Sequence, residues 1–121
     1  MNRDSAIKTL IGLRMAVGVG AWLTPRVAGK LFGLDPAGNP QAPYLARLFG
    51  IRDFALAWGA MNSDGEAQRR WLTAGLACDV ADSAAGIAGA RGGYLPKLTG
   101  LMVTATALSA AALGTVALGE E

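Results

Sequence analysis

The sequence predicts an all-α fold: one domain over residues 1–121, built as a four-helix transmembrane bundle with a short interfacial amphipathic segment between the first two helices. Three observations predict it. The composition is 52% hydrophobic and only 17% charged. The apolar residues form four runs of roughly 19 to 25 residues, the length that a helix needs to cross a hydrocarbon layer about 30 Å thick. Turn-forming residues separate the runs.

The first predicted helix covers residues 6–24. Ser5 is placed to cap it, and Pro25 ends it, because the residue before a proline avoids helical geometry. A row of small residues at four-residue spacing would let another helix approach closely. This row consists of Gly12, Ala16 and Gly20.

The segment that follows is rich in glycine and proline but contains a short amphipathic pattern. Val27, Leu31 and Leu34 fall at helical spacing, with Arg26 and Lys30 on another side. We therefore expect a turn or two of helix lying in the headgroup region of a membrane.

The second predicted helix, residues 41–61, has faces of different character. A seam of small side chains with one carboxylate repeats at four and three residues. It consists of Ala46, Gly50, Asp53, Ala57 and Ala60. A bulky face consists of Arg47, Ile51, Phe54 and Trp58. We interpret the bulky face as the contact with a partner protein; contact with lipid is the alternative.

The third helix is predicted over residues 66–90 and the fourth over residues 95–118. The third repeats the small-residue spacing, in a seam of Gly75, Asp79, Asp82, Gly86 and Gly89. The seams of the second and third helices are therefore expected to pack against each other as an antiparallel hairpin. The fourth helix carries no ionisable residue after Lys97, ends at an acidic tail, Glu120–Glu121, and is the strongest transmembrane prediction.

Ionic side chains from three helices are predicted to lie at a common depth. They are Arg14, Arg52, Asp53, Asp79 and Asp82. Asp79 and Asp82 share a helical face and would repel each other, so Arg14 and Arg52 are their expected partners. Arg52 and Asp53 point about 100° apart and are not expected to pair. With Arg47 included, the charges inside the spans sum to zero.

This charge cluster has two interpretations. It is either a neutral set of ion pairs that fixes the register of the helices, here called a polar pin, or a functional site that relays protons or holds an ion or lipid headgroup. The zero sum favours the pin, because a cation site would more often leave a net negative charge.

The residue types argue against an enzyme. The chain has no histidine, and its one cysteine, Cys78, lies in an apolar run. Asp79-x-x-Asp82 resembles the start of the CDP-alcohol phosphotransferase signature, but Ser83 stands where glycine is required, and no second aspartate pair follows. Two carboxylates cannot hold the two metals of that chemistry. We therefore expect no catalytic residue, metal or cofactor. The scattered basic residues likewise predict no nucleic-acid partner.

Several short motifs resemble those of the DoxX-like proteins, small four-helix bacterial membrane proteins, and most closely a branch with no assigned activity. The motifs are Leu23-Thr24-Pro25, Leu31-Phe32-Gly33, Arg47 to Asp53, Trp71-Leu72 and Asp79 to Asp82. The resemblance implies four spans and a multi-pass location in the bacterial plasma (inner) membrane. It carries no catalytic residue. Small proteins of this type also occur as accessory subunits of larger assemblies.

These observations predict a non-catalytic accessory subunit that contacts membrane lipids and packs against a larger inner-membrane complex, for which a lipid transporter and a respiratory assembly are the candidates. The alternative is a small transporter or ion-conducting oligomer that uses the buried arginines and aspartates. A lipid-modifying enzyme is a third hypothesis, and it would require a divalent metal.

Overall fold

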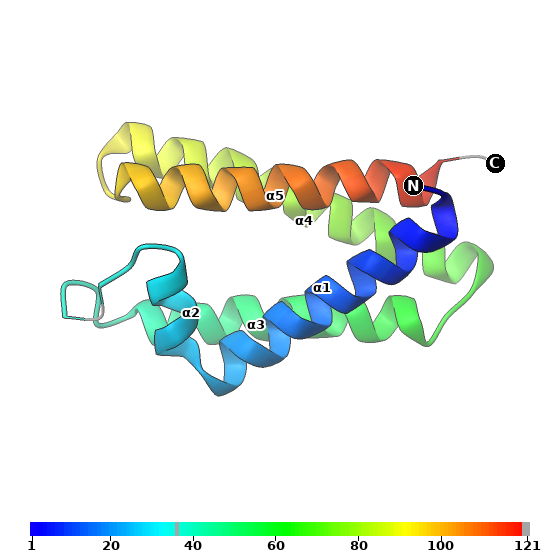
Figure 1. Cartoon of the computed structure of the whole chain (residues 1–121), viewed down its shortest axis with the longest axis horizontal. Helices are drawn as coiled ribbons and strands as arrows, with labels where there is room; N and C mark the ends of the chain where they lie inside the picture. Colours follow the sequence, from blue (N-terminus) through cyan, green and yellow to red (C-terminus); the bar gives the residue numbers. More distant parts are fainter. Residues whose placement is uncertain (36, 120–121) are drawn as a thin grey trace.

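The computed structural model describes residues 1–35 and 37–119, and the regular structure in them is entirely helical. Figure 1 shows the five helices. They are α1 (Arg3–Leu23), α2 (Pro25–Leu31), α3 (Ala42–Met61), α4 (Gly65–Gly92) and α5 (Lys97–Leu118). The all-α prediction is confirmed, and the ends of the four long helices lie within three residues of the predicted ends. The predicted tail Glu120–Glu121 lies outside the described residues.

The N-terminus of α1 differs from the prediction. Asn2 caps the helix, with its side-chain oxygen accepting a hydrogen bond of 2.8 Å from the backbone N–H of Ser5. Ser5 therefore lies inside the first turn and is not the cap. Asparagine and serine are about equally good caps, so the residue type alone does not decide between them.

The four long helices associate as two pairs. Figure 1 shows α4 and α5 side by side as an antiparallel hairpin, while α3 diverges from α4 after their shared turn and lies against α1. The predicted packing of the α3 seam on the α4 seam is therefore wrong. A Cβ on Gly18 would lie 2.7 Å from the backbone oxygen of Gly50, so α1 and α3 touch through their backbones. On α4, Gly86 faces Thr104 of α5.

The contact face of α1 is also not the predicted row of small residues. A Cβ on Gly12 or Gly20 would have no neighbouring atom within 4 Å, and Ala16 is exposed. The buried stripe instead passes through Arg14 and Gly18, which are four residues apart. The arginine that faces the interior sets the rotation of α1, and the small residues at other positions face outward.

The interior consists of small side chains, and many large apolar side chains lie on the outside. Of the ten buried hydrophobic residues among those described, six are alanines. Trp22, Leu45, Trp58 and Leu101 are each about half exposed or more. A protein in water shows the opposite distribution, because its large apolar side chains gain most from burial.

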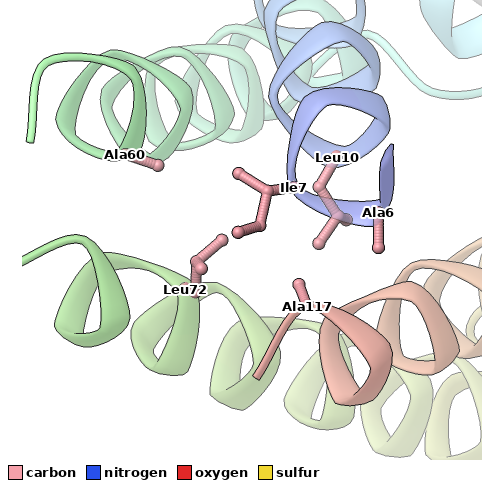
Figure 2. Close-up of a cluster of buried hydrophobic side chains, with 6 residues drawn as sticks. All are labelled: Ala6, Ile7, Leu10, Ala60, Leu72 and Ala117. Carbon is pink, nitrogen blue, oxygen red and sulfur yellow. The ribbon is translucent and has the colours of Figure 1, made fainter. Parts of the chain in front are cut away.

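One compact apolar cluster lies at the end of the molecule where the first turn of α1 meets the last turn of α5. Figure 2 shows side chains from α1, α3, α4 and α5 meeting there. The cluster consists of Ala6, Ile7, Leu10, Ala60, Leu72 and Ala117. It closes this end of the helix assembly, so the two helix pairs are held together here.

Arginines from neighbouring helices cap two helix C-termini. Arg3 donates from Nε to the backbone oxygen of Ala117 (3.1 Å), and Arg69 donates from Nη1 to that of Leu118 (3.1 Å). Arg47 donates from Nε to the backbone oxygen of Trp22 at the end of α1 (3.0 Å). A cation here satisfies a carbonyl that lacks a partner within its helix and lies at the negative end of the helix dipole.

Two of the described helices, α1 and α5, are long and apolar enough to cross a membrane. The strongest transmembrane prediction, the last helix, is one of them. Helices α3 and α4 are as long, but α3 contains Arg47, Arg52 and Asp53, and α4 contains two aspartates in its central part. The charges in α3 and α4 therefore need a separate explanation.

Candidate functional site

The five ionic residues of the predicted cluster meet in the middle of the molecule, and we call them the charge layer. Arg14 comes from α1, Arg52 and Asp53 from α3, and Asp79 and Asp82 from α4. The layer thus connects the α1/α3 pair with α4 of the other pair. Its side chains form two hydrogen-bonded arginine–aspartate ion pairs, and the remaining aspartate lies within 3.5 Å of an arginine without such a bond.

The first ion pair, Arg14 with Asp79, is sealed from the exterior. Arg14 donates two parallel hydrogen bonds to the carboxylate, of 3.1 Å from Nη1 and 2.7 Å from Nη2. Only 10% and 4% of the two side chains are exposed. Gly75 makes room for the guanidinium, because a Cβ there would lie 2.8 Å from Arg14 Nη2. This two-point geometry is the strongest form of such a pair.

The second ion pair, Arg52 with Asp82, has the same geometry but is partly open. Its two hydrogen bonds are 2.9 Å and 2.6 Å long. The exposed fractions are 33% for the arginine side chain and 23% for the aspartate. The guanidinium also lies over the ring of Phe49, 4.7 Å from its centroid, which is a cation–π contact. The structure thus contains both of the expected arginine–aspartate pairs.

The fifth member, Asp53, receives no hydrogen bond from a guanidinium. It is 5% exposed, and its Oδ1 is buried without a hydrogen-bond partner. The nearest cationic group is Nη2 of Arg52, at 3.5 Å. The expectation that Arg52 and Asp53 would not pair is therefore wrong, because their charged groups lie within ion-pair distance. The long arginine side chain bends back toward Asp53, although it donates no hydrogen bond to it.

The charge layer has a net charge of −1 when all its groups are ionised, since it holds three aspartates and two arginines. The predicted sum of zero included Arg47, but Arg47 lies elsewhere. Its guanidinium donates to the backbone oxygen of Trp22 and lies 5.9 Å from the centre of the Trp22 ring. Within the layer, one negative charge is not balanced.

The predicted partner face on α3 borders an open apolar groove. Ile51 and Trp58 are 48% and 55% exposed, and the rings of Phe54 and Trp58 stack with centroids 6.0 Å apart. The groove has a volume of about 220 Å³. It is lined by Gly18, Val19, Trp22, Leu23, Gly50, Ile51 and Phe54. Its α1 side was not predicted, because the contact between Gly18 and Gly50 is visible only once α1 and α3 are paired.

Comparison with known proteins assigns no family. No family model, curated protein or solved structure matches this chain. The resemblance to DoxX-like proteins therefore stays a prediction from short motifs. Function has to be inferred from the geometry.

The geometry limits what the charge layer can do chemically. Both guanidiniums are engaged by carboxylates, so neither is free to hold an anionic ligand. Among the described residues, no three cysteine or carboxylate side chains are grouped so as to hold a metal ion. Two atoms of the layer are buried without a hydrogen-bond partner, Nε of Arg52 and Oδ1 of Asp53, and Asp53 is the carboxylate among them. The layer is thus suited to linking helices and to binding a proton.

Proposed function

We propose that this chain is a four-span protein of the bacterial inner membrane, in which α1, α3, α4 and α5 all cross the lipid, and that it acts as a non-catalytic accessory subunit of a larger membrane complex. The distribution of side chains supports the membrane location. Small residues fill the interior, and large apolar residues face outward, where lipid would solvate them. A particle in water would instead expose these side chains at a large cost.

The charges of α3 and α4 are compatible with crossing a membrane. Asp53 and Asp79 are at least 95% buried, so they face the protein interior rather than lipid. Arg47 lies one turn or so from the start of α3 and reaches the end of α1, where a long side chain can extend toward the headgroups. Ionisable groups within spans commonly pair in this way.

The observation that carries the accessory role is the exposure of the Arg52–Asp82 pair. These side chains lie near the middle of α3 and α4, yet a third of one and about a quarter of the other are uncovered. A charged pair facing hydrocarbon is costly, so such pairs usually face protein or a water-filled cavity. We therefore infer that a partner protein covers this surface, which we call the α3/α4 flank: Leu48, Phe49, Arg52 and Asp82.

The predicted partner face lies beside this flank on α3 and is better suited to lipid. Ile51, Phe54 and Trp58 are apolar, and the groove beside them is lined by apolar and small residues. Acyl chains can cover such a surface without cost, whereas the α3/α4 flank requires polar partners. The proposal therefore assigns the bulky face to lipid and the flank to protein.

Affinity purification from native membranes, with identification of the companion proteins by mass spectrometry, tests the accessory role. Leu48→Trp adds bulk on the α3/α4 flank and is expected to remove the companions. Leu101→Trp on α5, which is 66% exposed, is the matched control and is expected to retain them. Recovery of the native protein alone, as a monomer or as a homo-oligomer, would contradict the proposal.

A second candidate function is ion transport by an oligomer of this chain, and the unbalanced charge of the layer favours it. The residue to test is Asp53, because replacing Asp79 would leave Arg14 without its partner and disturb the fold. The transport hypothesis predicts that Asp53→Asn abolishes a proton- or ion-dependent flux in proteoliposomes. The accessory role predicts that the purified native chain has no such flux.

A further inference from the structure

Asp53 is the carboxylate of the charge layer that lacks both a balancing positive charge and a hydrogen bond to its buried oxygen. It is 5% exposed, and its Oδ1 is buried and accepts no hydrogen bond. Arg52 Nη2 lies 3.5 Å from it but only 2.6 Å from Asp82. A carboxylate buried in this way loses its solvation by water, and the loss is compensated only when partners donate to it.

The charged groups that act on Asp53 come from three helices. Arg14 of α1, Arg52 of its own helix and Asp79 of α4 all lie within electrostatic reach. Each of the two arginines is already matched by an aspartate in a two-point pair. The two pairs together are neutral, so the charge of Asp53 remains uncompensated at the centre of the molecule.

We propose that Asp53 is a proton-binding site and that the bound proton makes the charge layer neutral. A proton needs a single oxygen and no coordination shell, and the buried Oδ1 of Asp53 provides such an oxygen. A metal ion would need several oxygen ligands, and the other carboxylates of the layer already accept hydrogen bonds from arginines. The ligand is therefore the proton.

The partly open ion pair provides the route between Asp53 and the exterior. Arg52 lies between Asp53 and Asp82, and its side chain and that of Asp82 are the exposed members of the layer. When the carboxylic acid of Asp53 releases its proton to water, the carboxylate attracts Arg52 more strongly. Movement of the guanidinium by about 1 Å toward Asp53 would weaken its bonds to Asp82. Proton binding and the Arg52–Asp82 pair are thus coupled.

Infrared spectroscopy of the purified full-length protein in lipid nanodiscs tests this inference independently of any partner. The C=O stretch of a protonated carboxyl group is expected at neutral pH, and it should disappear at alkaline pH. Asp53→Asn should remove the band. Asp4→Asn, at an exposed position in the first turn of α1, is the control and should leave it unchanged. Absence of the band in the native protein, or its persistence in Asp53→Asn, would overturn the proposal.

A second variant keeps the test decisive if Asp53→Asn does not fold. In the native protein made with ¹³C-labelled aspartate, the band should shift to lower frequency. In Asp53→Glu made with the same label, the carboxyl group at this position is unlabelled, and the band should no longer shift. A band that still responds to the aspartate label in Asp53→Glu would come from another residue and would contradict the assignment.

Discussion

The two ion pairs of the charge layer have the same chemistry and nearly the same geometry but different surroundings. Their shortest hydrogen bonds are 2.7 Å for Arg14–Asp79 and 2.6 Å for Arg52–Asp82. The exposed fraction of the arginine, however, rises from 10% in the first pair to 33% in the second. The first pair is enclosed within the chain, whereas the second is partly uncovered, and there we propose that a partner protein binds.

This difference separates the two roles that the sequence left as alternatives. The sealed pair has the geometry expected of the predicted polar pin, because it joins α1 to α4 and is enclosed. The open pair, together with Asp53, whose Oδ1 accepts no hydrogen bond, has the features expected of an interaction site. One part of the cluster can therefore stabilise the fold, while the other part forms a surface available for function.

The largest effect is expected from Asp79→Asn, which breaks the sealed pair and leaves the Arg14 guanidinium buried without a counter-charge. Loss of one partner from a buried pair typically costs about 3 to 5 kcal/mol of unfolding free energy. Reversible unfolding of the purified protein in bicelles would measure the loss. Arg14→Met combined with Asp79→Leu should recover most of the lost stability, because removing both charges leaves no buried charge without a partner.

Gly75→Ala is expected to destabilise the same pair by a smaller amount, because the new Cβ would lie 2.8 Å from Arg14 Nη2 and displace the guanidinium. Overpacking of this kind costs about 1 to 3 kcal/mol. Gly12→Ala, on an open part of α1, is the control and should be neutral or slightly stabilising. Equal effects of the two substitutions would show that Gly75 has no special relation to the pair.

Asp82→Asn breaks the open pair and should cost the isolated protein only about 0 to 1 kcal/mol, the range of partly exposed pairs. Arg52 keeps Asp53 at 3.5 Å as a substitute partner. In native membranes the same variant should lose its companion proteins, which co-purification would detect. A loss of stability as large as that of Asp79→Asn would remove the distinction between the two pairs.

Asp53→Asn should change the unfolding free energy least of the four substitutions. It leaves both ion pairs in place and replaces a group that we propose to be neutral with another neutral group. The same bicelle measurement applies. A large destabilisation would indicate that the ionised carboxylate contributes to the fold, in conflict with proton binding at this site.

The helices and the common level of the charges along them could be predicted from the sequence, because both follow from spacing along the chain. The pairing of the helices could not. A seam of small residues fits any other such seam, so the seam of α3 packs on α1 instead of on α4. The contacts of the Arg47 and Arg52 side chains could not be predicted either. A long flexible side chain can reach several groups, and which one it contacts depends on how the neighbouring helices pack.

The contact between Arg3 and Ala117 brings the two ends of the described chain to one end of the molecule. A short linker could therefore join residues 119 and 2 and keep the Asn2 cap of α1, and a new opening in the loop between α2 and α3 would give a circularly permuted protein with the same helix contacts. If all four long helices cross the bilayer, reporters fused at either original end would also lie in the same compartment.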